Sequence, residues 1–176
     1  DAEPESWNID VNKIEEKITN KTKAIMPVSI FGHPCDMEKI WELAAKYNLK
    51  VIEDAAESHG AEYNGLKTGN LADITTFSFF ANKNLTTGEG GMVVTNNEKL
   101  YKQCLYFKNL CFSLDSPRNY MHNDIGFNYR ISNIHCAIGL AQVEKADEYK
   151  ALRIKNADEY KIYLSEVPGV SFQQTK

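Results

Sequence analysis

The chain has 176 residues, of which 43% are hydrophobic and 25% charged, values close to those of an average globular protein. No apolar run approaches the roughly 20 residues that a membrane-spanning helix needs, and no basic-then-apolar leader opens the sequence. The net charge of −4 provides no basic surface for nucleic acid or an anionic membrane. We therefore expect a cytoplasmic protein with neither kind of partner.

The first predicted element is a helix over residues 9–19. Val11, Ile14 and Ile18 are spaced by three and four positions, which places them on one helix face. Asp10 is expected to be its N-cap, because an Asp side chain can accept hydrogen bonds from the first free amides of a helix.

A strand–helix–strand unit follows. Residues 23–32 form a short apolar run typical of a buried strand, residues 37–48 a helical pattern, and residues 50–55 a second strand. Asp36 is the expected N-cap of the helix and Asn48 its C-cap. A unit of this kind predicts two parallel strands joined by a right-handed crossover. The expected buried helix face consists of Ile40, Leu43, Ala44 and Tyr47.

The second half of the chain continues the alternation. Residues 74–80 and 90–96 are predicted strands, and residues 96–110 form a helix that begins at an Asn cap. Residues 131–167 are predicted to be one long helical stretch that begins near Ser132 and links two domains.

Four cysteines occur without a CxxC pair, which predicts neither a zinc knuckle nor a disulfide framework. We interpret them as reduced thiols. Cys35, Cys104 and Cys136 lie in apolar or helical contexts and are expected to be small core residues. No metal-ligand spacing connects the histidines, so no metal site is predicted; they are His33, His59, His122 and His135.

Three residues in the middle of the chain have a shared chemical meaning. Asp54 ends a predicted strand, Ser78 lies in the next one, and Lys83 precedes the glycine-rich run TTGEGG. Pyridoxal phosphate needs a carboxylate to keep its ring nitrogen protonated, donors for its phosphate, and an amine that bonds to its aldehyde. Because ligands of parallel sheets collect at the carboxyl ends of the strands, the sequence predicts a pyridoxal-phosphate site there.

The segments EDAAESHGAEYNG, SFFANKNLTTGEGGMVVT and NDIGFNYRISNIHCAIGLAQVE resemble the central blocks of the DegT/DnrJ/EryC1/StrS sugar aminotransferases. The resemblance is greatest to the perosamine-synthase type, which aminates nucleotide-linked 4-keto-6-deoxysugars for polysaccharide or O-antigen biosynthesis. It implies a three-layer α/β fold, that of type I pyridoxal-phosphate transferases (aspartate aminotransferase-like), with a mostly parallel sheet. It also implies a homodimer with shared active sites.

Within this resemblance, the implied reaction moves an amino group from Glu or Gln to the keto-sugar. Relatives that remove a sugar hydroxyl carry histidine in place of the lysine, so Lys83 favours transamination. Two alternatives remain open: a sugar dehydratase on the same scaffold, and a non-catalytic fragment or regulatory relative.

The resemblance also assigns further site residues. Glu57 is expected near the cofactor's ring hydroxyl or the substrate, and Asn128 is expected to reach the phosphate of the neighbouring subunit's cofactor. Independently of the resemblance, His122 is a candidate for substrate contact, since it lies in the loop before Asp124. Arg130 has two open interpretations, a structural pair with a carboxylate or a phosphate or nucleotide ligand. His59 is interpreted as a hydrogen-bonded structural residue.

Finally, the resemblance implies a position within a longer protein. Residues 1–132 are expected to be part of the cofactor-binding large domain, and residues 133–176 the connecting helix and the start of a small C-terminal domain. An upstream segment with a Gly-Thr phosphate turn and a ring-stacking aromatic is expected before Asp1. The long irregular loop 111–124 is interpreted as a substrate-side or interface segment.

Overall fold

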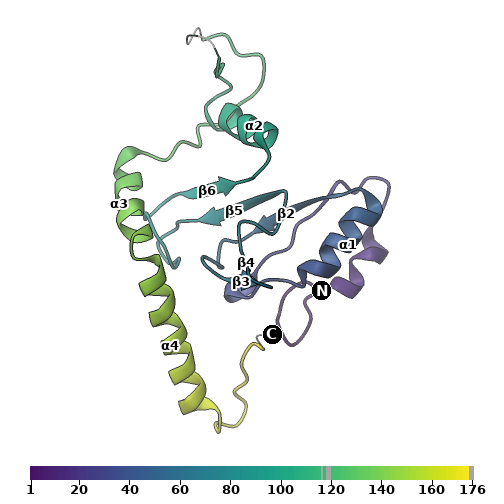
Figure 1. Cartoon of the computed structure of the whole chain (residues 1–176), viewed down its shortest axis with the longest axis vertical. Coiled ribbons are helices and arrows are strands. Elements are labelled where there is room, and N and C mark those ends of the chain that lie inside the picture. Colours follow the sequence, from purple (N-terminus) through teal and green to yellow (C-terminus); the bar gives the residue numbers. More distant parts are fainter. Residues whose placement is uncertain (116, 118–119, 175–176) are drawn as a thin grey trace.

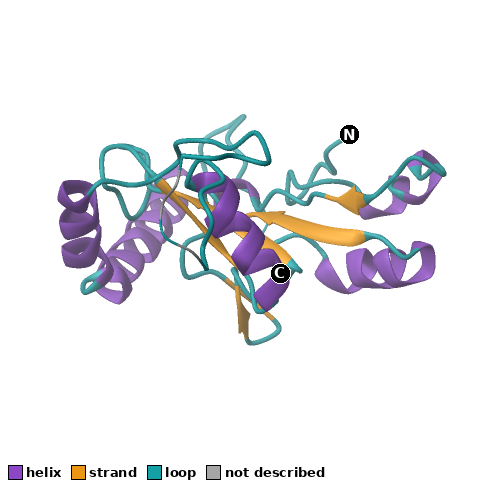
Figure 2. Ribbon diagram, turned by 90° about the horizontal axis from the view of Figure 1, so that it is seen from above, coloured by secondary structure: helices purple, strands orange, loops and turns teal. Residues whose placement is uncertain are grey.

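The computed structural model describes residues 1–115, 117 and 120–174, and shows an α/β fold around a four-stranded sheet. The strands lie in the order β1 (Ala24–Ile25), β2 (Lys50–Asp54), β5 (Ile74–Ser78) and β6 (Gly91–Val94). The first three are parallel and β6 is antiparallel to β5, which confirms the mostly parallel sheet. Figures 1 and 2 show the strands in the middle of the molecule, and in Figure 1 α1 lies to the right of them and α3 to the left.

The predicted strand–helix–strand unit is confirmed. Helix α1 (Met37–Tyr47) connects the parallel strands β1 and β2. The Asp36 side chain accepts a hydrogen bond from the Lys39 amide, and Asn48 ends the helix in a left-handed conformation with φ 51°. Both caps are therefore those that the sequence predicts.

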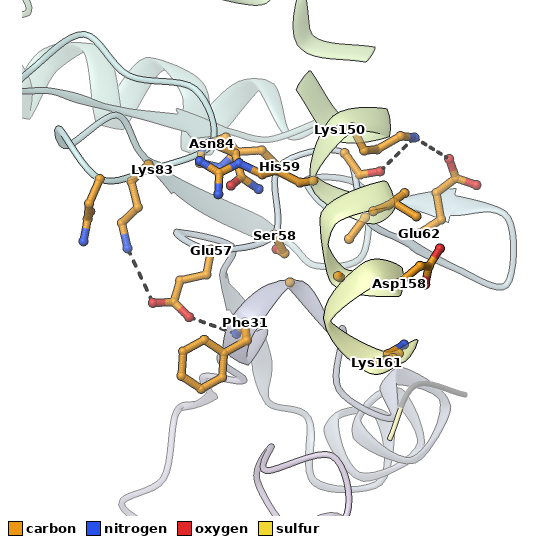
Figure 3. A pocket seen from close by; sticks show the side chains of 17 residues that line it. Phe31, Glu57, Ser58, His59, Glu62, Lys83, Asn84, Lys150, Asp158 and Lys161 are labelled. Atoms are coloured by element: carbon orange, nitrogen blue, oxygen red, sulfur yellow. Dashed lines mark hydrogen bonds and ion pairs between the residues drawn. The ribbon is translucent and has the colours of Figure 1, made fainter. Parts of the chain in front are cut away.

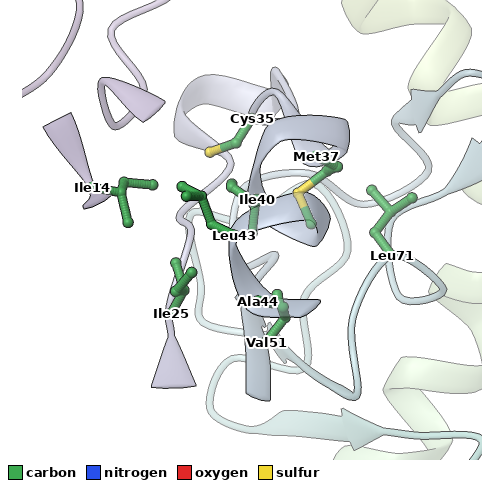
Figure 4. Packing of buried hydrophobic residues seen from close by; sticks show 9 residues of the cluster. All are labelled: Ile14, Ile25, Cys35, Met37, Ile40, Leu43, Ala44, Val51 and Leu71. Carbon is green, nitrogen blue, oxygen red and sulfur yellow. The ribbon is translucent and has the colours of Figure 1, made fainter. Parts of the chain in front are cut away.

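The core of the protein lies between α1 and the sheet (Figure 4). Ile40 is completely buried, and the Trp41 indole donates a hydrogen bond of 2.7 Å to the Leu71 carbonyl at its edge. Tyr47 differs from the prediction, since it is exposed and its hydroxyl bonds to Glu15. The cluster of buried residues is Ile14, Ile25, Cys35, Met37, Ile40, Leu43, Ala44, Val51 and Leu71.

The prediction of a single helix over residues 9–19 is wrong. The structure has two short 3₁₀ helices, Val11–Lys13 and Glu15–Lys17, although Asp10 does cap the first of them by accepting from the Asn12 amide. A 3₁₀ helix has three residues per turn. A spacing of three between apolar residues therefore fits this geometry as well as an α-helix.

The strand predicted over residues 23–32 is shorter than expected. Only Ala24–Ile25 form β1, because Pro27 has no amide hydrogen to continue the ladder. Pairing resumes in a single bridge between Val28 and Asp54, and the chain then turns through a 3₁₀ segment, Ile30–Gly32. This turn brings the chain back toward the end of β2.

A small hairpin was not predicted. It joins β3 (Glu62–Tyr63) to β4 (Leu66–Lys67). Asn64 and Gly65 form its turn with φ of 49° and 78°, values that favour Asn-Gly in a two-residue hairpin.

Helix α2 (Glu98–Lys108) confirms its prediction, with the Asn97 side chain as N-cap. The long helical stretch is instead two helices, α3 (Asn133–Val143) and α4 (Ala146–Leu164). Ser132 caps α3 as expected. None of the helices in the described parts of the chain is both long and apolar enough to cross a membrane.

The four cysteines are free thiols, which confirms that part of the interpretation. Cys35 is buried as predicted and Cys104 is partly buried. The prediction for Cys136 is wrong, because its face of α3 is exposed. Cys111, for which no prediction was made, is buried.

Candidate active site

The candidate site lies at the carboxyl ends of two neighbouring parallel strands. Asp54 ends β2 and is in register with Thr76 of β5, so that Ser78 follows at the same edge of the sheet. The Asp54 backbone is fixed by hydrogen bonds to Pro27 and from Ser29. One oxygen of its carboxylate accepts from the Ala56 amide at 3.0 Å. Within the described residues, no cation pairs with this carboxylate.

Ser78 and Lys83 belong to the turn that follows β5. The Ser78 hydroxyl oxygen accepts from the Phe80 amide at 3.2 Å, which leaves its proton available to a ligand. The turn closes through a hydrogen bond of 2.9 Å from the Thr87 amide to the Phe79 carbonyl. Lys83 is thereby held beside the sheet edge, with only 18% of its side chain exposed.

The glycine-rich run in this turn has a specific steric requirement. Gly90 has a φ of 142°, and a Cβ atom there would lie 2.9 Å from the Thr87 hydroxyl and 3.0 Å from the Ile131 side chain. A larger residue would be strained and would displace both neighbours. Gly90 therefore allows the turn that carries Lys83 to pack against the start of α3.

Glu57 is the side chain that contacts Lys83 in the described structure. Its Oε1 lies 3.6 Å from the Lys83 Nζ, and its Oε2 accepts from the Phe31 amide at 2.9 Å (Figure 3). The resemblance placed Glu57 near the cofactor or substrate. Its position beside the lysine brings together the two residues, 26 positions apart in the sequence, that could exchange a proton with a bound molecule.

His59 packs against aromatic side chains of β5 and of the turn that follows it. Its ring lies 5.3 Å from that of Phe77 and 5.9 Å from that of Phe79. Both ring nitrogens are buried, and within the described part of the chain neither has a hydrogen bond of normal geometry. Burial lowers the pKa of His59, the Ser78 backbone partly opposes this by interacting with the ring, and the charge of Lys83 adds to the lowering. The imidazole is therefore neutral at neutral pH.

The remaining predicted residues lie on the segment between α2 and α3. The His122 ring nitrogen Nδ1 contacts the Leu110 carbonyl at 2.7 Å, and the Arg130 Nε donates to the Asn128 Oδ1 at 3.2 Å. All three side chains are exposed, and among the described residues none of them forms a hydrogen bond or an ion pair with Asp54 or the Lys83 turn. The predicted loop 111–124 is only partly covered, since residues 116 and 118–119 lie outside the described residues.

A cavity of about 880 Å³ lies against this site, between the Lys83 turn and α4 (Figure 3). Sequence reasoning missed its α4 wall, where Lys150, Arg153 and Lys161 line the cavity. Lys150 reaches the Gly60 carbonyl and lies 3.9 Å from Glu62. Charged positions on a helix are usually solvated, so no signal in the sequence distinguishes these three from other lysines and arginines.

The residues at the sheet edge fit pyridoxal phosphate. Among the described residues, Asp54 retains an unpaired carboxylate oxygen for a protonated ring nitrogen, Ser78 retains a hydroxyl proton for a phosphate, and Lys83 supplies a partly buried amine. These are the three groups that the cofactor requires from a protein. Together with the mostly parallel sheet, they match the fold of type I pyridoxal-phosphate transferases.

Comparison with known proteins agrees with this class. The chain belongs to the DegT/DnrJ/EryC1/StrS aminotransferase family, whose model matches residues 1–176. It is 56% identical over 161 residues to the GDP-perosamine synthase of Escherichia coli O157:H7, a match that covers 92% of this chain and 44% of that relative. It is 50% identical to the GDP-perosamine synthase of Caulobacter vibrioides, over 87% of this chain and 41% of the relative.

Solved structures have the same fold. The E. coli GDP-4-keto-6-deoxy-D-mannose-3-dehydratase with bound hydrated PLP superimposes with a TM-score of 0.89 at 27% identity, over 98% of this chain and 48% of that one. The chain thus spans less than half the length of these relatives.

Proposed function

We propose that the protein is a pyridoxal-phosphate-dependent aminotransferase that transfers an amino group from Glu or Gln to a nucleotide-linked keto-deoxysugar of the perosamine type. The identity of 56% to a GDP-perosamine synthase supports this substrate class. A GDP-linked 4-keto-6-deoxysugar is therefore the first substrate to test.

Each residue at the sheet edge has a role in this proposal. Asp54 would hold the proton on the cofactor's ring nitrogen, and Ser78 would donate to its phosphate. When bound, the cofactor supplies a ring that accepts electrons from the substrate carbon. Lys83 would accept and return the proton of that carbon, because its amine lies at the same edge and is partly buried.

The observation that carries the proposal is a lysine at position 83, held by Glu57 beside Asp54 and Ser78. Members that dehydrate sugars were expected to carry histidine there. A primary amine can form a covalent bond with an aldehyde, which an imidazole cannot maintain. The lysine at position 83 therefore favours transamination over the dehydratase alternative.

The test is Lys83→Ala in the complete protein, with Glu as donor and GDP-4-keto-6-deoxymannose as acceptor. Amino-sugar formation, followed by mass spectrometry, should fall by roughly 10²- to 10⁴-fold or more, as expected when an acid–base and nucleophilic group is removed. Lys155→Ala, on an exposed part of α4, is the matched control and should keep normal turnover. Near-normal activity of Lys83→Ala would refute the assignment, and a deoxygenated product from the unaltered enzyme would favour the dehydratase.

We also propose a homodimer in which Asn128 contributes to the partner's site. Two observations support it. Asn128 is exposed, and its side chain accepts a hydrogen bond from Arg130 of its own segment. Its neighbours Ile125 and Tyr129 are 87% and 73% exposed, as expected for a surface that a second subunit covers.

Subunit mixing tests this arrangement. A heterodimer of Lys83→Ala and Asn128→Ala subunits has both lesions in one site and leaves the other intact. With random exchange, about half the dimers are mixed and each has one working site, so activity should return to about a quarter of normal. Verified exchange without recovery would show that Asn128 does not act across an interface.

The domain assignment stays a proposal. We assign residues 1–132 to the cofactor-binding domain and residues 133–176 to the connecting helices and the start of a second domain. The position of the core within the first part supports this division, although residues 175–176 lie outside the described residues. The free thiols support a reducing compartment, such as the cytoplasm.

A further inference from the structure

The two carboxylate oxygens of Glu57 have different partners. Oε2 accepts a hydrogen bond of 2.9 Å from the Phe31 amide, and Oε1 lies 3.6 Å from the Lys83 Nζ (Figure 3). A backbone amide is a fixed donor, and its hydrogen bond to a charged acceptor is stronger than one between neutral groups. The Phe31 amide therefore orients the carboxylate so that its other oxygen faces Lys83.

Phe31 adopts an unusual conformation in order to do this. Its φ of 50° and ψ of 28° lie in the left-handed region, where a bulky residue costs about 1–3 kcal/mol. Packing of the ring does not account for that cost, because Phe31 is 70% exposed and its aromatic contact among the described residues is edge-to-face with Trp7 at 5.9 Å. The amide directed at Glu57 is the polar contact that this conformation provides.

Asn8 holds the turn in this conformation. Its side chain is almost completely buried, at 2% exposure. The Oδ1 accepts from the Ile30 amide at 3.0 Å, and the Nδ2 donates to the carbonyls of His33 and Pro34 at 2.9 and 3.2 Å. One amide side chain thus connects the backbone on both sides of Phe31, with its two donors and its acceptor all in use.

The turn is also attached to the strand that carries the site. The Ser29 amide donates to the Asp54 carbonyl at 3.1 Å, and Glu57 follows Asp54 by three residues. The Phe31 amide and the Glu57 carboxylate are therefore both attached to the same edge of the sheet. A shift of the turn changes the position of the carboxylate directly.

We propose that Asn8 and the Phe31 amide are positioning residues that orient Glu57 and, through it, the Lys83 amine. The importance of that amine rests on the function proposed above, whereas the chain of contacts from Asn8 to Lys83 does not. Neither Asn8 nor Phe31 touches the reacting atoms in this account. Their effect is to fix the position of the Lys83 amine in the cofactor-free protein.

The test measures the reactivity of Lys83 without the cofactor. In the cofactor-free complete protein, acetic anhydride labels lysines, and mass spectrometry gives the labelling rate of Lys83 relative to the exposed Lys155. A carboxylate that holds an ammonium group slows the reaction of that amine. Glu57→Gln should therefore raise the relative rate several-fold. Phenyllactic acid in place of Phe31 replaces only the amide N–H by an ester oxygen and should raise it in the same direction.

Two further variants separate positioning from folding. Glu62→Gln removes the carboxylate beside Lys150 and should raise the labelling of Lys150 while leaving that of Lys83 unchanged. Asn8→Asp keeps the acceptor for Ile30 but loses both donors, and should raise the labelling of Lys83 at a urea concentration where the protein is still folded.

An unchanged Lys83 rate in the folded Glu57→Gln and Phe31 ester proteins would overturn the inference and leave the turn a purely structural role. Because the readout needs no cofactor, it is independent of the proposed function. If Lys83→Ala still catalysed transamination, the proposed function would fail while the labelling result would stand.

Discussion

The unit from β1 to β2 and the helices α3 and α4 use apolar residues in opposite ways. In the first, Ile40 and its neighbours on α1 are buried against the sheet. In the second, no residue is buried, and Ile134 and Leu140 of α3 are 75% and 63% exposed. The first unit contains its own core, whereas α3 and α4 present apolar surface that the described residues do not cover. A surface of that kind is typical of an interface.

Thiol chemistry gives the largest expected contrast between the two regions. Burial raises the pKa of Cys35 to about 11, and the thiol is 1% exposed, whereas Cys136 on α3 is exposed. In the 176-residue chain at neutral pH, a disulfide reagent should label Cys136 at least ~10³-fold faster than Cys35, which needs both opening and ionisation. Peptide mapping shows which cysteine accounts for the fast part of the labelling reaction and which for the slow part. Slow labelling of Cys136 would break the comparison, because it would mean that α3 is covered in solution.

Truncating one isoleucine in each region sharpens the same contrast. Ile40→Ala leaves a cavity in the core and should lower the free energy of unfolding by about 2–5 kcal/mol. Ile134→Ala removes an exposed side chain and should change it by less than about 0.5 kcal/mol. Urea unfolding of the 176-residue chain measures both. Equal losses would show that α3 is part of the folding core.

The first unit is also the part of the fold that the sequence predicts best. Asp36, Asn48 and the run of residues 50–55 are local signals with a direct physical basis, and each is confirmed. The prediction of an α-helix over residues 9–19 was wrong because a spacing of three between apolar residues does not distinguish a 3₁₀ helix from an α-helix. The break between α3 and α4 at Glu144–Lys145 has no glycine or proline to mark it.

The candidate site also has a part that the sequence predicts and a part that it does not. Asp54, Ser78 and Lys83 could be predicted because strand ends and a glycine-rich turn are visible in the sequence, and the structure places Asp54 and Ser78 at one sheet edge. The contact from Phe31 to Glu57 could not be predicted, since a backbone amide leaves no trace in residue identity. The burial of the His59 ring against Phe77 and Phe79 could not be predicted either, because it depends on tertiary packing.

The buried carboxyl of Glu53 offers the smallest but most specific test of the first unit. Glu53 is fully buried on β2, and its Oε2 accepts from the Gly69 amide and the Thr75 hydroxyl, both at 2.9 Å. Burial raises the pKa of Glu53 above its ordinary value. A pKa that is higher in the folded state contributes stability below the unfolded pKa, and this contribution is lost as the pH rises through the folded pKa.

The free energy of unfolding of the unaltered chain, relative to that of Glu53→Gln, should therefore decrease as the pH is raised from about 4 toward neutral.

Asp73 provides a matched control whose pKa is shifted in the opposite direction. Burial opposes its charge, but the Val51 amide and the Lys50 side chain outweigh this and lower the pKa of Asp73. Its contribution is present above the unfolded pKa and is lost as the pH falls, so stability relative to Asp73→Asn should increase with pH. Urea unfolding at a series of pH values measures both differences. If the two differences changed with pH in the same direction, the pH dependence would not arise from the contacts of Glu53 and Asp73 around β2.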